Sequence, residues 1–419
     1  MLSKAENERL ARVGPGTPAG QLLRHYWHPV AVAQELTEEN PTKFVRILGE
    51  DLVLFRDKRG RVGLLADRCS HRGVSLSYGR VEERGIACAY HGWLYDINGN
   101  CLETPAEPAG SKFHLTIKHK AYPVRKFLGL YWAYLGPAPA PLIPPFDIWM
   151  RKDARRGVAV YPVVDCNWLQ SMENSVDPAH LPILHLDTTA RGNKAASSTT
   201  RGFIDEIENV EFYEIPYGIM KRRVFKDGYQ DQHPLIFPNN LRQANSTQFR
   251  VPIDDSHTWH VHIKFEPTED GSLIEEEEDP PVEYYEAFKN PPNGQHPFAR
   301  YTRHIPLAQD HMAWETAGPI WDRTQERLAT SDRGIVMFRE ILKREIDKVQ
   351  KGLDPIGVFR GDQPVIDTKL SEALASGQYG DRRRIWQIKN EDRRNLIIGS
   401  APAGISGRDL GEPKPGHTR

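Results

Sequence analysis

Residues 69–96 read CSHRGVSLSYGRVEERGIACAYHGWLYD, and the spacing of Cys and His in this segment is the strongest indication of the fold. It holds Cys69 and His71 as C-x-H, then, after sixteen intervening residues, Cys88 and His91 as C-x-x-H. Each group is short enough to lie in a single loop that presents one thiolate and one imidazole. Two such loops can hold one metal centre between them.

Two thiolates and two imidazoles fit a Rieske [2Fe-2S] cluster, in which Cys residues bind one iron and His residues bind the other. A structural zinc site accepts the same four ligands. Zinc motifs usually group Cys with Cys and His with His, whereas each loop here carries one of each. We therefore expect an iron–sulfur cluster. The chain has four cysteines in all, which is too few for a disulfide scaffold of this size.

A second group of metal-binding residue types follows about ninety residues downstream, in NWLQSMENSVDPAHLPILH at 167–185. We expect a helix that begins near Asn167 and a bend at Pro182. Three of the candidate residues should share one helix face; the candidates are Asn174, Asp177, His180 and His185. Non-haem Fe(II) oxygenases bind iron through two His and one carboxylate and keep positions open for O2 and substrate. The pattern D-x-x-H-x4-H is weak alone, but an upstream cluster needs an electron acceptor.

The segments CSHRGVSLSYG and CAYHGWLYD resemble the Rieske domain of bacterial ring-hydroxylating oxygenases, and residues 167–185 resemble their catalytic iron site. Respiratory Rieske proteins carry an extra cysteine in each loop, where this chain has Val74 and Tyr90. The resemblance is therefore to the oxygenase alpha subunits, and within them to the phthalate-dioxygenase-like branch.

This resemblance implies that His180 and His185 bind a mononuclear iron. It implies that Asp177 bridges a Rieske His of a neighbouring subunit to an iron-ligating His, because such carboxylates fix the orientation of a ligand. Asn174 would lie near the open iron position. In LAQDHMAWETAGPIWDRTQERLATSDRG, Asp310 matches the Asp that completes the triad in this branch. The rival carboxylates are Glu315, Asp322 and Asp332.

The resemblance implies an α+β fold with a small all-β Rieske domain and a larger helix-grip catalytic domain built on an antiparallel sheet. We expect three parts: an N-terminal helical segment at 1–40 that packs on the catalytic domain, a Rieske domain at 41–138, and a catalytic domain at 139–419. Residues 43–66 have the pattern of a β-meander, and 128–136 that of a strand. The Pro-dense segment PAPAPLIPPF then marks the boundary.

The second domain has its own periodic segments. Residues 158–164 indicate a strand, and TWHVHIKF at 258–265 alternates as a half-buried strand does. Apolar residues recur at helical spacing from Ile335 to Val349, with Ser331 and Asp332 available as caps. The acidic run EEEEDPP at 275–281 indicates a solvated loop.

Other histidines and arginines have weaker patterns. His260 and His262 form H-x-H but lack a following carboxylate pattern, so we expect them to line a pocket or contact solvent. His25 and His28 lie in an amphipathic stretch and should pack or form hydrogen bonds. An aromatic carboxylate would need a guanidinium partner, because the two can pair bidentately. The candidates are Arg222, Arg223, Arg242 and Arg250.

The balance of 55 Lys and Arg against 56 Asp and Glu, a net charge of -1, does not favour nucleic acid or an anionic membrane as a partner. The start lacks the order of a secretory signal, and no run is long enough for a membrane helix, so we expect a cytoplasmic enzyme.

The resemblance implies a terminal oxygenase that uses O2 and NADH-derived electrons, received from a flavin-containing reductase or a ferredoxin. The activity would be O-demethylation or hydroxylation of a carboxylated, lignin- or phthalate-like aromatic compound. A cis-dihydroxylating dioxygenase is the alternative reaction, and a Rieske-type electron carrier the alternative class. The family implies a homotrimer or a trimer-based hexamer.

Overall fold

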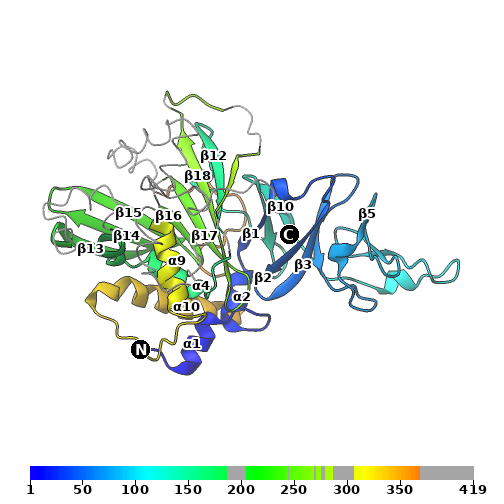
Figure 1. Cartoon of the computed structure of the whole chain (residues 1–419), viewed down its shortest axis with the longest axis horizontal. Helices are drawn as coiled ribbons and strands as arrows, with labels where there is room; N and C mark the ends of the chain where they lie inside the picture. Colours follow the sequence, from blue (N-terminus) through cyan, green and yellow to red (C-terminus); the bar gives the residue numbers. More distant parts are fainter. Residues whose placement is uncertain are drawn as a thin grey trace, which may run out of the picture.

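The computed structural model describes residues 1–161, 163–185, 204–243, 245–268, 270–274, 279–285 and 306–368. Figure 1 shows a small β region at one end of the molecule and a larger sheet with helices packed on it at the other. None of the helices in these ranges combines the length and the apolar composition needed to cross a lipid bilayer.

The N-terminal segment contains helices α1 (Lys4–Ala11) and α2 (Pro18–Arg24) and strand β1 (Trp27–Val32). Ser3 and Glu6 form a capping box at the start of α1, which satisfies two backbone donors that the helix leaves unpaired. Both helices contact α10 (Arg333–Gln350) of the larger region, whereas β1 pairs with β11 (Leu130–Tyr134). The division of the chain at residues 41 and 138 stays a prediction.

The small region consists of two four-stranded sheets. The meander predicted over 43–66 is confirmed by antiparallel pairing of three consecutive strands. The first sheet contains β2 (Thr42–Ile47), β3 (Glu50–Arg56), β4 (Val62–Ala66) and β9 (Ala121–Tyr122). The second contains β5 (Arg80–Glu82), β6 (Gly85–Ala87), β7 (Leu94–Tyr95) and β8 (Cys101–Glu103). Short 3-10 helices are η2 (Leu76–Tyr78) and η3 (Phe113–Thr116) in this region and η1 (Ala33–Glu35) directly before it.

A three-stranded sheet joins the two regions, in the order β1, β11 and β10 (Val124–Phe127). The strand predicted over 128–136 is confirmed by β11. Trp132 of β11 packs edge-on against Phe249, with 5.2 Å between ring centroids, and Phe249 belongs to the large sheet. Buried aromatic rings therefore fix the small region on the large one.

The large sheet has eight strands in the order β13, β14, β15, β16, β17, β18, β12, β19. All neighbouring pairs are antiparallel except β12 and β19, which are parallel. The strands are β12 (Ala154–Val160), β13 (Ile207–Ile215), β14 (Gly218–Phe225), β15 (Gln230–Ile236), β16 (Asn240–Gln243), β17 (Ser246–Pro252), β18 (Thr258–Pro267) and β19 (Val282–Tyr284). The predicted α+β fold, with a small β domain and a mainly antiparallel second sheet, is confirmed.

The strand predicted over 258–265 is confirmed as β18, but its burial was predicted wrongly. His260 and His262 are buried, as are Val261 and Ile263 on the other face. Both faces are covered because aromatic and aliphatic side chains pack on one side and helix α9 (Pro306–Thr316) contacts the other.

Helices α3 (Asp147–Met150), α4 (Trp168–Ser175), α5 (His180–Leu184) and α9 belong to the larger region, with the turn η4 (Thr330–Asp332) ahead of α10. Phe338, Leu342 and Ile346 lie on the buried face of α10, as their spacing predicts. Asp332 is at the N-cap position but makes no capping bond, because its carboxylate accepts from the Ala329 N–H. Of the acidic run predicted as a loop, residues 275–278 lie outside the described ranges.

Candidate metal centres

Two loops of the small region close in the same way. The Cys69 N–H donates to the Val74 carbonyl at 2.9 Å, and the Cys88 N–H donates to the Trp93 carbonyl at 2.9 Å. Gly73 and Gly92 follow their cysteines by four residues, donate back to the carbonyls of Cys69 and Cys88, and have φ of 73° and 72°. This conformation is open to glycine at little cost. The sequence therefore builds two matched loops.

The four predicted cluster ligands come together at the tips of these loops. The Cys69 and Cys88 side chains are buried, and the His71 and His91 rings lie 4.6 Å apart nearer the surface. Trp93 stacks on His71 with 4.4 Å between centroids. Thiols inside and imidazoles nearer the surface fit a Rieske cluster, in which two thiolates bind one iron and two imidazoles bind the other.

The second group consists of His180, His185 and Asp310. One donor atom from each lies within 4.8 Å of the others. The His185 Nε2 is 3.2 Å and the His180 Nε2 is 3.8 Å from the same Asp310 oxygen. Two imidazole nitrogens and one carboxylate thus converge on a point, as the facial triad of non-haem iron requires.

The other nitrogen of each imidazole lies beside a side-chain oxygen, in hydrogen-bond geometry for His185 but not for His180. The His180 Nδ1 lies 3.3 Å from the Asp177 carboxylate, and the His185 Nδ1 contacts the Gln309 side-chain oxygen. An acceptor at Nδ1 fixes the tautomer and turns Nε2 toward the metal position. Gln309 has no motif that marks it in the sequence, although it directly precedes Asp310. Asn174 donates from its side-chain amide to Asp310 at 3.2 Å.

Charges in this group stabilise one another. Burial by itself lowers the pKa of His185, but the hydrogen bond and the charge of Asp310 raise that pKa above its ordinary value. Burial raises the pKa of Asp310, but the hydrogen bond to His185 and the charges of His185 and His180 outweigh burial, so the pKa of Asp310 is lowered. Asp310 is therefore an anion at neutral pH, which is the state that binds a cation.

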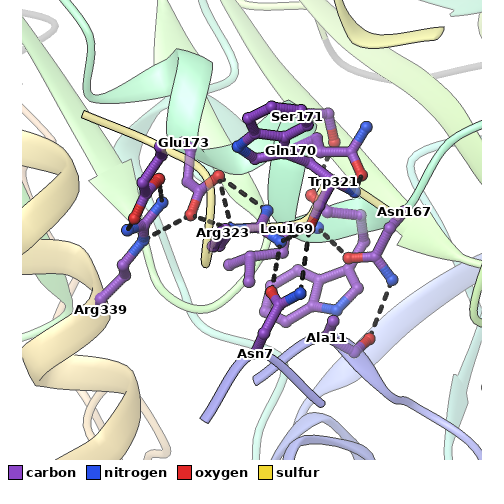
Figure 2. A network of polar contacts seen from close by, with 12 residues as sticks. Asn7, Ala11, Asn167, Leu169, Gln170, Ser171, Glu173, Trp321, Arg323 and Arg339 are labelled. Atoms are coloured by element: carbon purple, nitrogen blue, oxygen red, sulfur yellow. Dashed lines mark hydrogen bonds and ion pairs between the residues drawn. The ribbon is translucent and has the colours of Figure 1, made fainter. Parts of the chain in front are cut away.

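Helix α4 leads into this group and is anchored by a buried polar network (Figure 2). Glu173 accepts from the guanidinium groups of Arg323 and Arg339, at 2.8 and 2.7 Å respectively. The Asn167 side chain caps α4 by accepting from the Leu169 N–H at 3.0 Å. These contacts fix both ends of a helix that otherwise presents an apolar face to the core.

Gln170 ties α4 to the end of helix α9. Its side-chain amide donates to the Trp314 carbonyl at 3.0 Å and the Gly318 carbonyl at 2.9 Å. Gln170 therefore fixes the position of the segment that carries His180 relative to the helix that carries Asp310, although about 130 residues separate the two in sequence.

The prediction that one helix carries the candidate residues of 167–185 on a common face is wrong. Helix α4 ends at Ser175 and α5 begins at His180, so the expected common face does not exist. Pro178 is the physical reason, because a residue that precedes proline is disfavoured in the helical region, and Asp177 is that residue. Pro182, expected to bend the chain, lies inside α5.

Family models match two parts of the chain. The model of the Rieske [2Fe-2S] domain matches residues 26–124, and the model described as LigXa C-terminal domain like matches residues 300–392. The 5,5'-dehydrodivanillate O-demethylase oxygenase subunit of a Sphingobium species is 37% identical over 371 residues, which cover 86% of this chain and 84% of that protein. The chain belongs to the Rieske oxygenase family.

Other comparisons agree with this membership. The phthalate 4,5-dioxygenase oxygenase subunit of Pseudomonas putida is 32% identical to this oxygenase, over 95% of this chain and 98% of that one. Among solved structures, Pseudomonas putida CBB5 NdmA has a TM-score of 0.59 at 22% identity and covers 82% of this chain and 98% of its own. That likeness shows the shared fold.

The rival carboxylates of this oxygenase are engaged elsewhere. Glu315 accepts from the Asp165 N–H at 3.1 Å, and Asp322 accepts from the Thr324 N–H at 3.0 Å in an exposed turn. His28, expected to pack, is fully buried with its Nε2 2.8 Å from the Leu23 carbonyl. His260 is hydrogen-bonded to His311 and lies outside the metal group found among the described residues.

Proposed function

We propose that this Rieske oxygenase is the terminal component of a multi-component system and inserts oxygen from O2 into a small aromatic substrate. The observation that carries the proposal is the convergence of His180, His185 and Asp310 on one point. A Rieske domain alone moves electrons. A second site with two imidazoles and a carboxylate could bind an iron that accepts those electrons.

The residues present fit a ferrous ion at this group. His180, His185 and Asp310 would bind it, and the bound ion would supply reduction of O2 next to the substrate. Gln309 holds the His185 imidazole by Nδ1, and the Asp177 carboxylate lies 3.3 Å from the Nδ1 of His180. Asn174 holds Asp310 from the end of α4. The chain thereby keeps three donor atoms aimed at one position and leaves the remaining positions to O2 and substrate.

Electrons would come from NADH through a separate flavin-containing reductase, with or without a ferredoxin, and enter at the cluster loops. In Figure 1 the small region that carries these loops extends away from the end where α4 and α9 lie. We therefore infer a head-to-tail homotrimer, or a trimer-based hexamer, in which the cluster of one subunit serves the iron of the next. Asp177 would bridge the two subunits. A cytoplasmic location fits this assembly.

The reaction we favour is O-demethylation or hydroxylation of an aromatic compound. Insertion of one oxygen atom into a methyl C–H bond gives a hemiacetal that loses formaldehyde, while NADH supplies two electrons and the second oxygen atom leaves as water. Attack on the ring by both oxygen atoms, with two electrons from NADH and two protons, gives a cis-diol. The relatives include an O-demethylase subunit and a dioxygenase subunit, so the cis-dihydroxylating reaction is the second candidate.

The test uses the purified full chain, a surrogate reductase and a panel of methoxybenzoates, phthalates and biphenyl acids. We expect a red-brown protein with a rhombic EPR signal on reduction, three irons per chain, and formaldehyde or a diol as product. His185→Ala should keep the cluster spectrum and lose one iron together with turnover. Cluster reduction without any oxygenated product, in protein with iron at both sites, would instead indicate the electron carrier.

A further inference from the structure

One face of the large sheet carries a row of polar side chains across its central strands. Residues directly opposite in antiparallel strands lie on the same face, and so do residues two apart in one strand. Lys221 is opposite His233, and Arg250 is opposite His260. The register places these polar side chains on that face, with Leu241 between His233 and Gln248: Lys221, His233, Gln248, Arg250 and His260.

This face is turned toward α9, the helix that carries Asp310. The His260 Nδ1 lies 3.1 Å from the His311 Nε2, and the Arg250 guanidinium lies 5.9 Å from the centre of the Trp314 ring. His311 and Trp314 are both in α9. The polar row therefore lies on the same side of the sheet as the proposed iron ligands.

The structure shows which of the four arginines predicted as carboxylate partners lie on this face. Arg222 is partly exposed and pairs with Glu211 and Gln230 on the outer face. Arg242 is opposite Thr247 and points into the other face. Arg223 is on the iron side, but Asp231 already accepts from two of its nitrogens. Of the four predicted arginines Arg250 remains, and Lys221 is a second cation on the same face, which the sequence did not predict.

Lys221 and Arg250 are buried cations without a carboxylate partner among the described residues. Their exposed fractions are 5% and 2%. Arg250 donates only to the backbone carbonyl and the side-chain oxygen of Gln248, and its Nε has no partner within the described ranges. No hydrogen bond from the Lys221 ammonium to a described residue occurs. Burying a charge in this way costs stability unless something else pairs with it.

Both groups are charged at neutral pH. Burial lowers the pKa of Lys221 to about 8; the charges of Arg223 and Arg250 act in the same direction, and those of Asp231 and Asp177 oppose it. Burial lowers the pKa of Arg250 to about 9, with Asp310 opposing. Lys221 is thus near Asp177 and Arg250 near Asp310, and a ferrous ion would offset those two carboxylates. Two positive charges are then left unbalanced.

Aromatic rings lie beside Arg250 and its cross-strand neighbour His260. The rings of Tyr161 and Trp314 are centred 5.4 and 5.8 Å from that of His260. Buried rings with a few convergent polar groups are typical of small-molecule sites, and a guanidinium or an ammonium is the natural partner of a carboxylate. We propose that Lys221 and Arg250 bind the carboxylate of an aromatic acid and hold its ring beside the iron ligands. This inference rests on the proposed function and names its substrate class.

The experiment compares acids with their uncharged esters in the iron-loaded full-length protein. The probes are 4-methoxybenzoate, phthalate and biphenyl-3,3'-dicarboxylate, each with its methyl ester, and the measurement is calorimetric binding at pH 7. At least one acid should bind more than ten-fold tighter than its ester. Lys221→Met and Arg250→Met should each remove most of that preference. Arg222→Met, on the same strand but facing outward, should retain it.

Equal binding of all three acids and their esters, or a preference that survives both substitutions, would overturn the inference. Turnover measured with the same probes separates it from the proposed function. If an ester is oxidised and no acid binds more tightly than its ester, the protein is an oxygenase and the proposed anion site is wrong. Acid binding that depends on Lys221 without any oxygenated product supports the anion site and removes the oxygenase. Circular dichroism checks that each variant is folded.

Discussion

At the scale of single residues, the hydroxyl of Tyr95 lies 3.3 Å from the Cys69 sulfur. A hydrogen bond to a cluster sulfur stabilises the reduced, more negative cluster and so raises the reduction potential. Tyr95→Phe should lower the potential by roughly 40 mV, taking about 1 kcal/mol for the lost bond and a one-electron couple. Protein-film voltammetry measures this. Tyr78→Phe, at an exposed tyrosine of the same region, is the control; equal potentials in all three proteins would contradict the contact.

Lys221 gives a second prediction at this scale, on stability. The fall of its pKa from an ordinary 10.5 to about 8 corresponds to roughly 3 kcal/mol. Between pH 8 and pH 10.5 the unfolded chain binds more protons than the folded chain. The loss of folding free energy caused by the buried ammonium is therefore complete below pH 8 and disappears as pH rises to 10.5. Lys221→Met should therefore stabilise the substrate-free protein at pH 7 by roughly that amount.

Urea unfolding of the substrate-free protein at pH 7 and at pH 9.5 checks this, with Arg222→Met as the matched control. The stabilising effect of Lys221→Met should shrink at the higher pH. A Lys221→Met protein that is less stable than the parent at both pH values would mean that the ammonium has a partner in the folded protein.

At the scale of elements, α4 depends on the buried carboxylate of Glu173. Burial raises its pKa, and the charges and hydrogen bonds of Arg323 and Arg339 outweigh this, so the pKa is lowered. Breaking a buried ion pair from one side leaves the other charge unpaired. Glu173→Gln should thus destabilise the protein by roughly 3 to 5 kcal/mol, since Arg323 loses its carboxylate partner.

Denaturant unfolding measures this change. The loss should be complete at neutral pH and fade as pH falls below about 4.3, the unfolded value for glutamate, because the parent carboxylate then becomes protonated as well. Glu340→Gln on α10, whose side chain is 65% exposed, should change stability by less than about 0.5 kcal/mol. A Glu173→Gln protein as stable as this control would show that the network does not anchor α4.

At the scale of the whole molecule, the proposed trimer makes each subunit depend on its neighbour. Cys88→Ser removes a cluster ligand and His185→Ala removes an iron ligand, so each variant alone should be inactive. Co-expression of the two should restore part of the activity, because a mixed trimer contains an intact cluster next to an intact iron site of another subunit. Oxygen uptake per mole of purified mixed trimer is the measurement. Mixed trimers without activity would mean that electrons pass within one subunit.

Features that depend on local spacing could be predicted from the residues alone. Cys69, His71, Cys88 and His91 lie in two short loops, so their spacing alone was enough to predict a cluster. Residues 43–66 form a meander for the same reason, since each strand pairs with the next along the chain. His180 and His185 needed more, because the chain bends at Pro178 and only the upstream cluster made the pair credible.

Features that depend on contacts between distant segments became visible only in the folded chain. Asp310 lies about 130 residues from His180, and a family resemblance, not spacing, singled it out. Neither Gln309 nor Lys221 lies in a recognisable sequence motif. Gln309 acts because helix α9 brings it to His185, and Lys221 acts because the strand register places it on the same face as Arg250. Side-chain neighbours across a sheet follow from strand order and register, and these are fixed by the packing of the whole chain.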